Sequence, residues 1–130
     1  MKVAQLLDAS ALLAVAFNED GAEQVLLALS RPQVGITVAN LTEVISKLRQ
    51  RGMSMAGCRA FIDDLQLVVV SADTETALLA GELHAQTRWA GLSLGDATCL
   101  ATAVQFGASV VTADRAWGRL DVGVGIQVVR

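Results

Sequence analysis

The stretch VAQLLDASALLAVAF, residues 3–17, decides the fold. Its apolar run over residues 3–7 meets Asp8 without an intervening loop, and an apolar segment with helical character follows. Such a run is typical of a buried parallel strand that turns directly into a helix. Because ligands of open α/β sheets gather at the carboxyl ends of the strands, Asp8 occupies a position suited to chemistry.

The composition indicates one globular domain, which we expect to span residues 1–130. The chain is 53% hydrophobic, but its longest unbroken apolar run is the seven residues 11–17, and a membrane span needs about 20. We expect neither a membrane segment nor a signal peptide, and therefore a cytoplasmic protein. Cys58 and Cys99 lack metal-ligand spacing and are expected to be reduced thiols. The net charge of −3 disfavours a charge-driven nucleic-acid binder but allows an acidic metal site.

Further strands and helices alternate along the chain. Apolar or β-branched runs predict strands over residues 34–37, 67–70, 109–112 and 125–129. The segments between them have helical spacing, including a long helix from residue 74 to about residue 89 and a buried one after residue 93. The alternation predicts an α/β protein, a three-layer α/β/α sandwich with a mainly parallel sheet of about five strands.

Four acids are candidates for a functional site, and each also has a local structural explanation. Asp8 and Asp114 both follow strands and could cap the helical turns after them. Glu43 follows Asn40 by three residues, which resembles a capping pair, and Asp96 completes a capping box that begins at Ser93. The four candidates are Asp8, Glu43, Asp96 and Asp114.

Together the four acids indicate a metal site. Asp8 and Asp114 should project from one edge of the sheet, and the first turns that carry Glu43 and Asp96 can begin at the same edge. Four adjacent carboxylates repel one another unless cations neutralise them. Oxygen ligands in this number suit Mg²⁺ or Mn²⁺. Such an ion commonly assists the attack of water on a phosphodiester.

The chain resembles the PIN-domain ribonucleases of the VapC toxin type. The resemblance covers essentially the whole chain, in family order and spacing, and rests on four stretches: DASALLAVAFNEDGAE from Asp8, VANLTEVISKL from Val38, LSLGDATCLATA from Leu92 and TADRAW from Thr112. It implies a PIN-like fold and an Mg²⁺- or Mn²⁺-dependent endoribonuclease that uses no protein nucleophile.

The resemblance also implies roles for individual residues. The metal would be ligated by the first three acids, Asp8, Glu43 and Asp96, while Asp114 would be a further ligand or act through water. Ser10 and Thr112 match hydroxyl positions that would orient the carboxylates. Two alternatives stay open for Arg115, which would either pair with a site carboxylate or contact RNA phosphate.

The partners follow from the same resemblance. It implies the toxin of a type II toxin–antitoxin pair, which cleaves RNA, inhibits translation and growth, and is held in check by a small VapB-like antitoxin. A mean hydropathy of +0.49 is high for a small monomer, so we also expect a homodimer. The alternative is a catalytically silent PIN domain that binds RNA or protein.

Two other α/β classes are disfavoured by single residues. A phosphoacceptor receiver domain needs a lysine after a late strand, but the only lysines are Lys2 and Lys47. A haloacid-dehalogenase-like phosphatase would have an aspartate where Ser10 stands. A packing or surface role is expected for the single histidine, His84, because no second histidine or nucleophile accompanies it, and Trp117 is expected to pack onto the domain.

Overall fold

The computed structural model describes residues 2–130. In this part of the chain the strands are β1 (Gln5–Leu7), β2 (Val34–Thr37), β3 (Val68–Val70), β4 (Ser109–Thr112) and β5 (Ile126–Val128). The α-helices are α1 (Ala9–Ala16), α2 (Ala22–Leu29), α3 (Val38–Gln50), α4 (Met55–Leu65), α5 (Thr74–Gln86) and α6 (Leu94–Phe106). Two short 3₁₀ helices, η1 (Arg88–Ala90) and η2 (Arg115–Arg119), complete the fold.

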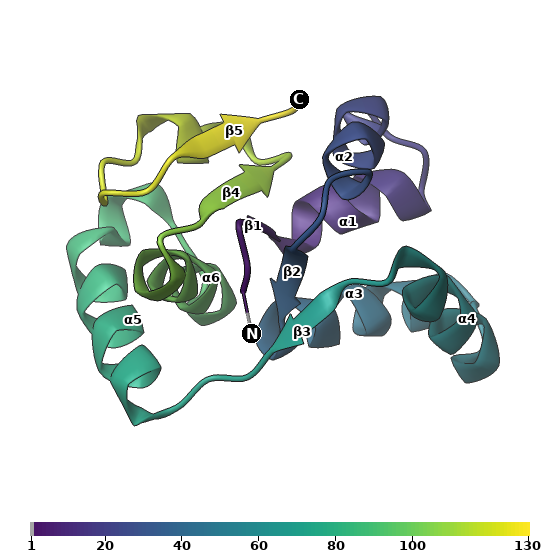
Figure 1. Cartoon of the computed structure of the whole chain (residues 1–130), viewed down its shortest axis with the longest axis horizontal. Helices are drawn as coiled ribbons and strands as arrows, with labels where there is room; N and C mark the ends of the chain where they lie inside the picture. The colour runs from purple at the N-terminus through teal and green to yellow at the C-terminus, as the bar shows by residue number, and fades with distance from the viewer. Residues whose placement is uncertain (1) are drawn as a thin grey trace.

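The five strands form one sheet in the order β3-β2-β1-β4-β5, with every neighbouring pair parallel (Figure 1). The first strand of the chain is therefore the central one. In the register of the sheet, Leu6 lies opposite Gly35 on one side and Val110 on the other. The predicted parallel α/β sheet is confirmed.

Each face of the sheet carries its own hydrophobic core. Successive residues of a strand point to opposite faces, and Leu7 packs with α1, α2, α3 and α4 while Leu6 packs with α5 and α6. The second core includes Trp117, which is completely buried, as expected. Helices thus cover both faces, and the predicted three-layer sandwich is confirmed.

Several element ends differ from the sequence prediction by one to three residues. The observed first strand begins at Gln5 rather than at residue 3, and the last strand ends at Val128. The long helix predicted to reach residue 89 divides into α5 and η1 at Thr87. The hydroxyl of Thr87 donates to the Leu83 carbonyl at 2.7 Å, and such side-chain bonds to the preceding turn often bend a helix.

The sheet topology brings the predicted site residues to one edge. Because β1 and β4 are parallel neighbours, the residues that follow them emerge side by side, and the Asp8 amide donates to the Val111 carbonyl at 3.1 Å. Helix α3 begins directly after β2 and packs against α6. Among residues 2–130, no helix has the length and apolar character needed to cross a membrane.

Gly21 supplies a test of the fold. Its φ is +95°, and a Cβ at this position would lie 2.6 Å from the Val129 carbonyl oxygen. We expect Gly21→Ala to lower the free energy of unfolding by roughly 2 kcal/mol, since backbone strain and a clash with main chain add together. Urea denaturation measures the change.

Gly81 provides the matched control, because it lies inside α5 and a Cβ there meets nothing within 4 Å. Gly81→Ala should raise the stability by up to about 1 kcal/mol through helix propensity. Equal urea midpoints for the two variants would contradict the close approach of Gly21 to Val129.

Candidate active site

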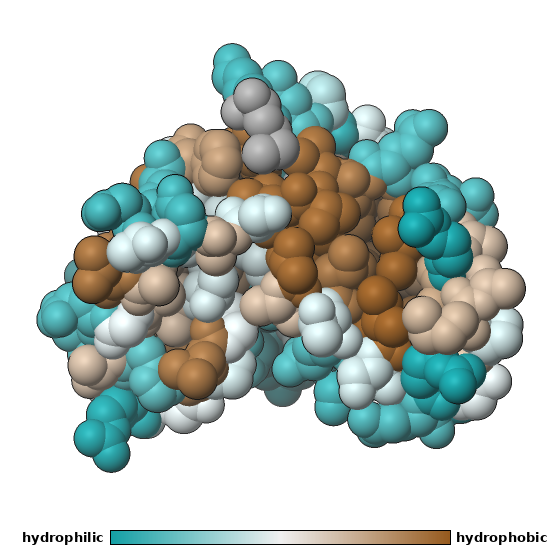
Figure 2. Space-filling model, turned by 90° about the horizontal axis from the view of Figure 1, so that it is seen from below, coloured by the Kyte–Doolittle hydropathy of each residue, from teal (hydrophilic) through white to brown (hydrophobic). Residues whose placement is uncertain are grey.

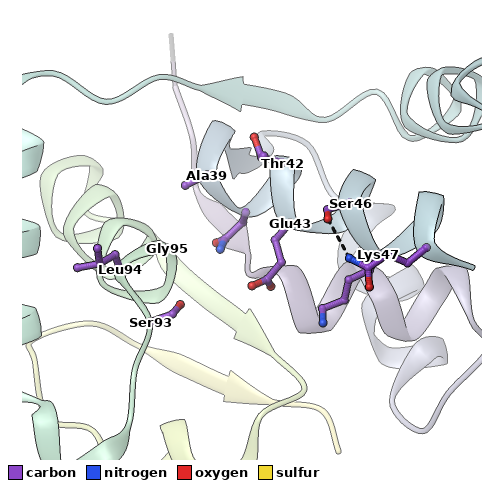
Figure 3. A pocket seen from close by; sticks show the side chains of 10 residues that line it. Ala39, Thr42, Glu43, Ser46, Lys47, Ser93, Leu94 and Gly95 are labelled. Carbon is purple, nitrogen blue, oxygen red and sulfur yellow. Dashed lines mark hydrogen bonds between the residues drawn. The ribbon is translucent and has the colours of Figure 1, made fainter.

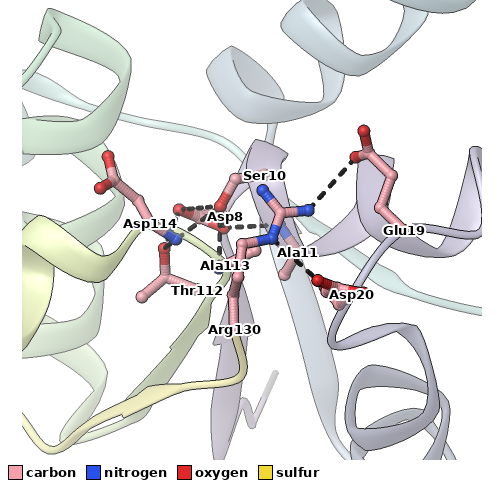
Figure 4. Close-up of polar contacts among 9 residues, drawn as sticks. All are labelled: Asp8, Ser10, Ala11, Glu19, Asp20, Thr112, Ala113, Asp114 and Arg130. Atoms are coloured by element: carbon pink, nitrogen blue, oxygen red, sulfur yellow. Dashed lines mark hydrogen bonds and ion pairs between the residues drawn. The ribbon is translucent and has the colours of Figure 1, made fainter.

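Asp8 lies at the centre of the candidate site and is only 2% exposed. One carboxylate oxygen, Oδ1, accepts hydrogen bonds from the Ser10 hydroxyl at 2.8 Å and the Ala11 amide at 2.9 Å. The other oxygen, Oδ2, accepts from the Thr112 hydroxyl at 2.5 Å (Figure 4). Asp8 is thus the N-cap of α1, as its position in the sequence indicated, but it is also bonded to a residue of β4.

The same two hydroxyls connect the ends of β1 and β4. The Ala113 amide donates to the Ser10 hydroxyl at 2.9 Å, and the Asp114 amide donates to the Thr112 hydroxyl at 3.0 Å. Both oxygens of Asp8 are therefore held by groups that are themselves held by main chain. This arrangement fixes the orientation of the carboxylate.

The environment of Asp8 disfavours its charge. Desolvation by burial raises the pKa of the carboxyl group from 3.8 to about 6, and the nearby Asp96 adds to the rise. The hydrogen bonds from Thr112, Ala11 and Ser10 oppose it. Among the described residues no lysine or arginine forms an ion pair with Asp8. A bound cation would supply the positive charge that the protein itself does not place there.

Asp96 and Asp114 cap helical turns, as predicted from their local sequence. Asp96 Oδ2 accepts from the Ser93 amide at 2.9 Å, and the Asp96 amide donates to the Ser93 hydroxyl at 3.1 Å, which completes the capping box. Asp114 Oδ1 accepts from the Ala116 amide at 3.0 Å. The second oxygen of each carboxylate has no hydrogen bond within residues 2–130, so each acid can still offer one oxygen to a ligand.

Glu43 has a different setting from the one predicted, because its suggested capping pair with Asn40 is wrong. The N-cap of α3 is Thr37, whose hydroxyl accepts from the Asn40 amide at 3.2 Å. Glu43 lies one turn further along and lines a cavity of about 710 Å³ between α3 and the start of α6. Figure 3 shows its carboxylate in this cavity, on the side facing Ser93 and Gly95.

The four acids lie near one edge of the sheet without closing into one cluster. Asp96 is close enough to Asp8 to raise the pKa of that carboxyl group, and both acids help to raise the pKa of the buried Cys99 thiol. Asp114 lines a separate cavity of about 530 Å³ together with Ser10. Within residues 2–130, no three histidine, cysteine, aspartate or glutamate side chains lie close enough to hold a metal ion.

The donor chemistry nevertheless fits a hard divalent cation. All candidate ligands are carboxylate, hydroxyl or amide oxygens, the type that Mg²⁺ and Mn²⁺ prefer. Asp8 is buried without a compensating positive charge, and the Oδ1 atom of Asn40 is buried with no hydrogen-bond partner among the described residues. An ion with its water shell would satisfy both groups.

Arg115 has no ion pair with a site carboxylate in the part of the chain that the structure describes. Its Nε atom donates to the Arg130 carbonyl at 3.3 Å, and its side chain lines the cavity that contains Asp114. His84 lies outside the site and bonds the Leu92 carbonyl through Nε2 at 3.1 Å. The predicted structural role of His84 is confirmed.

Sequence reasoning missed two residues of the Glu43 cavity. Lys47 lies in the last turn of α3, where the helix dipole by itself favours a basic residue, and Asn40 resembles a cap in the sequence, but both side chains line this cavity. Asn40 lies three residues before Glu43, and Lys47 lies four residues after it. This spacing in the sequence places all three on one face of a helix.

A parallel sheet with acids near its carboxyl edge defines a class of α/β protein, and comparison with known protein families identifies this class. The PIN domain family model matches residues 6–123. The chain belongs to the PIN domain family. No curated protein sequence matches the chain.

Solved structures share the whole fold at low sequence identity. A toxin–antitoxin complex from Klebsiella pneumoniae matches with a TM-score of 0.76 and 19% identity over 98% of each chain. VapBC from Salmonella typhimurium, solved bound to DNA, matches with a TM-score of 0.71 and 23% identity over 98% of this chain and 99% of that one. VapC20 of Mycobacterium tuberculosis, described as a sarcin–ricin loop cleaving toxin, gives 0.72 and 19% identity over 94% and 99%.

The raised pKa of Asp8 predicts a pH dependence of stability. Between its unfolded value of 3.8 and its folded value of about 6, the folded state binds the proton more tightly. Asp8 therefore contributes most stability below pH 4, and this contribution is lost as the pH rises through 6. The full loss corresponds to about 3 kcal/mol.

In metal-free buffer, wild type should lose this stability relative to Asp8→Asn between pH 4 and pH 7. Denaturant melts at each pH measure the difference, and Asp64→Asn, an exposed change in α4, serves as the control. A difference between wild type and Asp8→Asn that stays constant over this range would contradict the burial of a charged Asp8.

Proposed function

We propose that this protein is an Mg²⁺- or Mn²⁺-dependent endoribonuclease and the toxin of a type II toxin–antitoxin pair. The observation that carries the proposal is the buried Asp8 carboxylate, which two hydroxyls hold beside Asp96 at the carboxyl edge of a PIN-domain sheet. Resemblance to solved toxin–antitoxin complexes supports the toxin role.

In this proposal Asp8, Glu43 and Asp96 hold the cation, and Asp114 acts directly or through a water. When bound, the ion supplies positive charge and an acidified water for attack on the scissile phosphorus. Ser10 and Thr112 hold Asp8 in place, so the carboxylate does not need to reorganise during the reaction. Each of Asp96 and Asp114 uses one oxygen for its cap and keeps the other for the site.

Cys99 is the one cysteine near the acids, and its state disfavours covalent catalysis. Burial raises the pKa of its thiol well above the usual value, with further increases from Asp8 and Asp96. A thiol that stays protonated is a poor nucleophile. Hydrolysis by water is therefore the mechanism consistent with these residues.

RNA is the substrate class that we propose, with VapC20, described as cleaving the sarcin–ricin loop, as the precedent among similar folds. The charges around the site support a phosphate ligand, because Arg115 lines the Asp114 cavity without pairing to a carboxylate of the described chain. We assign Arg115 to a contact with RNA phosphate. Cleavage of cellular RNA would then inhibit translation and growth in the cytoplasm.

The exposed apolar residues of α2 are the contact site that we propose for a VapB-like antitoxin. Of the apolar residues of α1 and α2, Leu12, Leu13 and Val25 are buried and belong to the core. Leu26 and Leu27 of α2 are 51% and 65% exposed. An amphipathic helix of the antitoxin could pack on this exposed pair, in the helix-in-groove mode.

A homodimer is the second assembly that we propose. Figure 2 shows an apolar area on the face that lies at the bottom of Figure 1, where β3 and α4 are located. Met55 and Val69 are 58% and 42% exposed, and they line a groove of about 320 Å³ with Ile62. A symmetric dimer would cover such an area.

Asp96→Asn is the direct test of the enzyme. We expect the variant to lose Mg²⁺-dependent RNA cleavage by 100-fold or more, about 3 kcal/mol in the barrier, while it folds normally. The uncharged amide still accepts the Ser93 bond and removes repulsion with Asp8, so stability without metal should stay equal or rise. Asp114→Asn should be milder.

Cleavage assays with defined RNA and added Mg²⁺ or Mn²⁺, together with thermal melts, measure both effects, and Asp64→Asn is the control. Wild-type protein that binds RNA but cleaves none with either ion would favour the catalytically silent binding module instead. An Asp96→Asn variant that cleaves at the wild-type rate would refute the assignment of this acid.

Control by an antitoxin is tested by co-purification with a VapB-like small protein, for which a reading frame next to this gene is the first candidate. We expect a stable complex without nuclease activity, and Leu27→Glu should weaken it at least 10-fold because a charge enters the apolar contact. Leu78→Glu, at a 64% exposed site on α5, is the matched control. A complex that cleaves RNA as fast as the free protein would contradict inhibition by this partner.

A further inference from the structure

Asn40 carries a buried polar atom that the described residues leave unsatisfied. The residue is 1% exposed, and its Oδ1 atom has no hydrogen-bond partner within residues 2–130. A buried acceptor without a partner costs about 1–3 kcal/mol, and nearly all such groups in native proteins are bonded. The helix does not need this side chain, since Thr37 caps α3. Helix capping therefore does not account for this amide.

The position of Asn40 connects it with two of the proposed metal ligands. It precedes Glu43 by three residues on α3, so both side chains share one face of the helix and line the same cavity. On the other side it faces the first turn of α6, because a Cβ at Gly95 would lie 3.4 Å from Asn40 Nδ2. Gly95 directly precedes Asp96. The amide therefore lies where α3, which carries Glu43, packs against the first turn of α6, which carries Asp96.

Two other buried side-chain atoms of the described chain lack partners, Gln5 Oε1 and Trp117 Nε1. Neither residue lines the cavity that contains Glu43, and Trp117 is enclosed in the core beneath α6. Of these three residues, Asn40 is thus the one that lies beside the proposed metal ligands.

The enclosure of Asn40 limits what can bind to it. With 1% of the residue exposed, a ribose or base cannot reach the amide, so a hydrogen-bond partner for Oδ1 can be no larger than a water molecule. Mg²⁺ keeps several waters when carboxylates bind it, and each of these waters is a hydrogen-bond donor. We infer that Asn40 is a positioning residue that accepts a hydrogen bond from a water of the bound cation, on the side of Glu43 and Asp96. The inference rests on the proposed metal-dependent function.

Calorimetric titration of the metal-free protein with Mn²⁺ tests this role. Asn40→Leu keeps the volume but removes the acceptor, so we expect Mn²⁺ to bind 10- to 100-fold more weakly. The melting temperature without metal should stay equal or rise, because an unsatisfied buried group has been removed. If Asn40 were only structural, the melting temperature would fall and the affinity would not change, and this result would overturn the inference.

Thr42→Val is the matched control. Thr42 lies on the same helix and lines the same cavity, but its hydroxyl donates to the Val38 carbonyl at 2.8 Å. This variant should bind Mn²⁺ like wild type. An equal loss of affinity in both variants would show a general disturbance of α3 and would also overturn the specific role of Asn40.

A second measurement uses the wild-type chain and does not depend on a variant that folds. The sequence contains only two asparagines, Asn18 and Asn40, so their side-chain amide resonances are easily assigned after selective ¹⁵N labelling. Mg²⁺ should shift the Asn40 pair and leave the exposed Asn18 pair in place. Saturating Mg²⁺ that moves neither pair would overturn the inference.

The two hypotheses fail in different ways. Wild-type protein that binds neither Mn²⁺ nor Mg²⁺ would refute the proposed metal-dependent function and the role of Asn40 together. Wild-type protein that binds Mn²⁺ and cleaves RNA, beside an Asn40→Leu variant with unchanged affinity, would refute the role of Asn40 alone.

Discussion

The candidate site is organised around a buried carboxylate, which lies where the central strand β1 ends beside its neighbour β4. Asp8 ends β1, caps α1 and accepts a hydrogen bond from Thr112 at the end of β4. Burial of this group is unfavourable, as its raised pKa indicates, and the hydrogen bonds offset only part of that cost. A carboxylate that only capped the helix would cost less free energy at the surface, where water solvates its charge. The cost is reasonable if the same carboxylate must be held rigidly for a ligand.

Capping and ligand binding are compatible at this site because a carboxylate has two oxygens. Asp96 and Asp114 each engage a main-chain amide with one oxygen. These bonds orient the side chains and leave the second oxygens near the acidic edge. Local structure thus fixes one oxygen of each acid, and no closed three-ligand group forms among residues 2–130.

The contact between α3 and α6 gives the site its second half. Gly95 lies at this contact, where a Cβ would come within van der Waals distance of Asn40 Nδ2, at 3.4 Å. The cavity beside this contact is lined by Glu43 and Lys47, which lie four residues apart on one face of α3. Acidic and basic groups therefore share this cavity, whereas no basic residue of the described chain forms an ion pair with Asp8.

The sequence by itself determined the elements and the candidate acids. Apolar runs that end in Asp8 and Asp114, and the Ser93–Asp96 capping box, are local patterns, and local spacing is enough to specify strands, helix starts and caps. Only the tertiary structure decided that the first strand is central and that Thr112 bonds Asp8 across 104 positions of sequence. It also decided that Leu12 and Leu13 lie in the core while Leu26 and Leu27 stay exposed. Asn40, which resembled a cap in the sequence, is buried, and its Oδ1 has no partner among residues 2–130. The burial of a side chain and the pairing of its hydrogen-bonding atoms depend on which elements pack together. The apolar periodicity of one segment does not say which other segments will contact it.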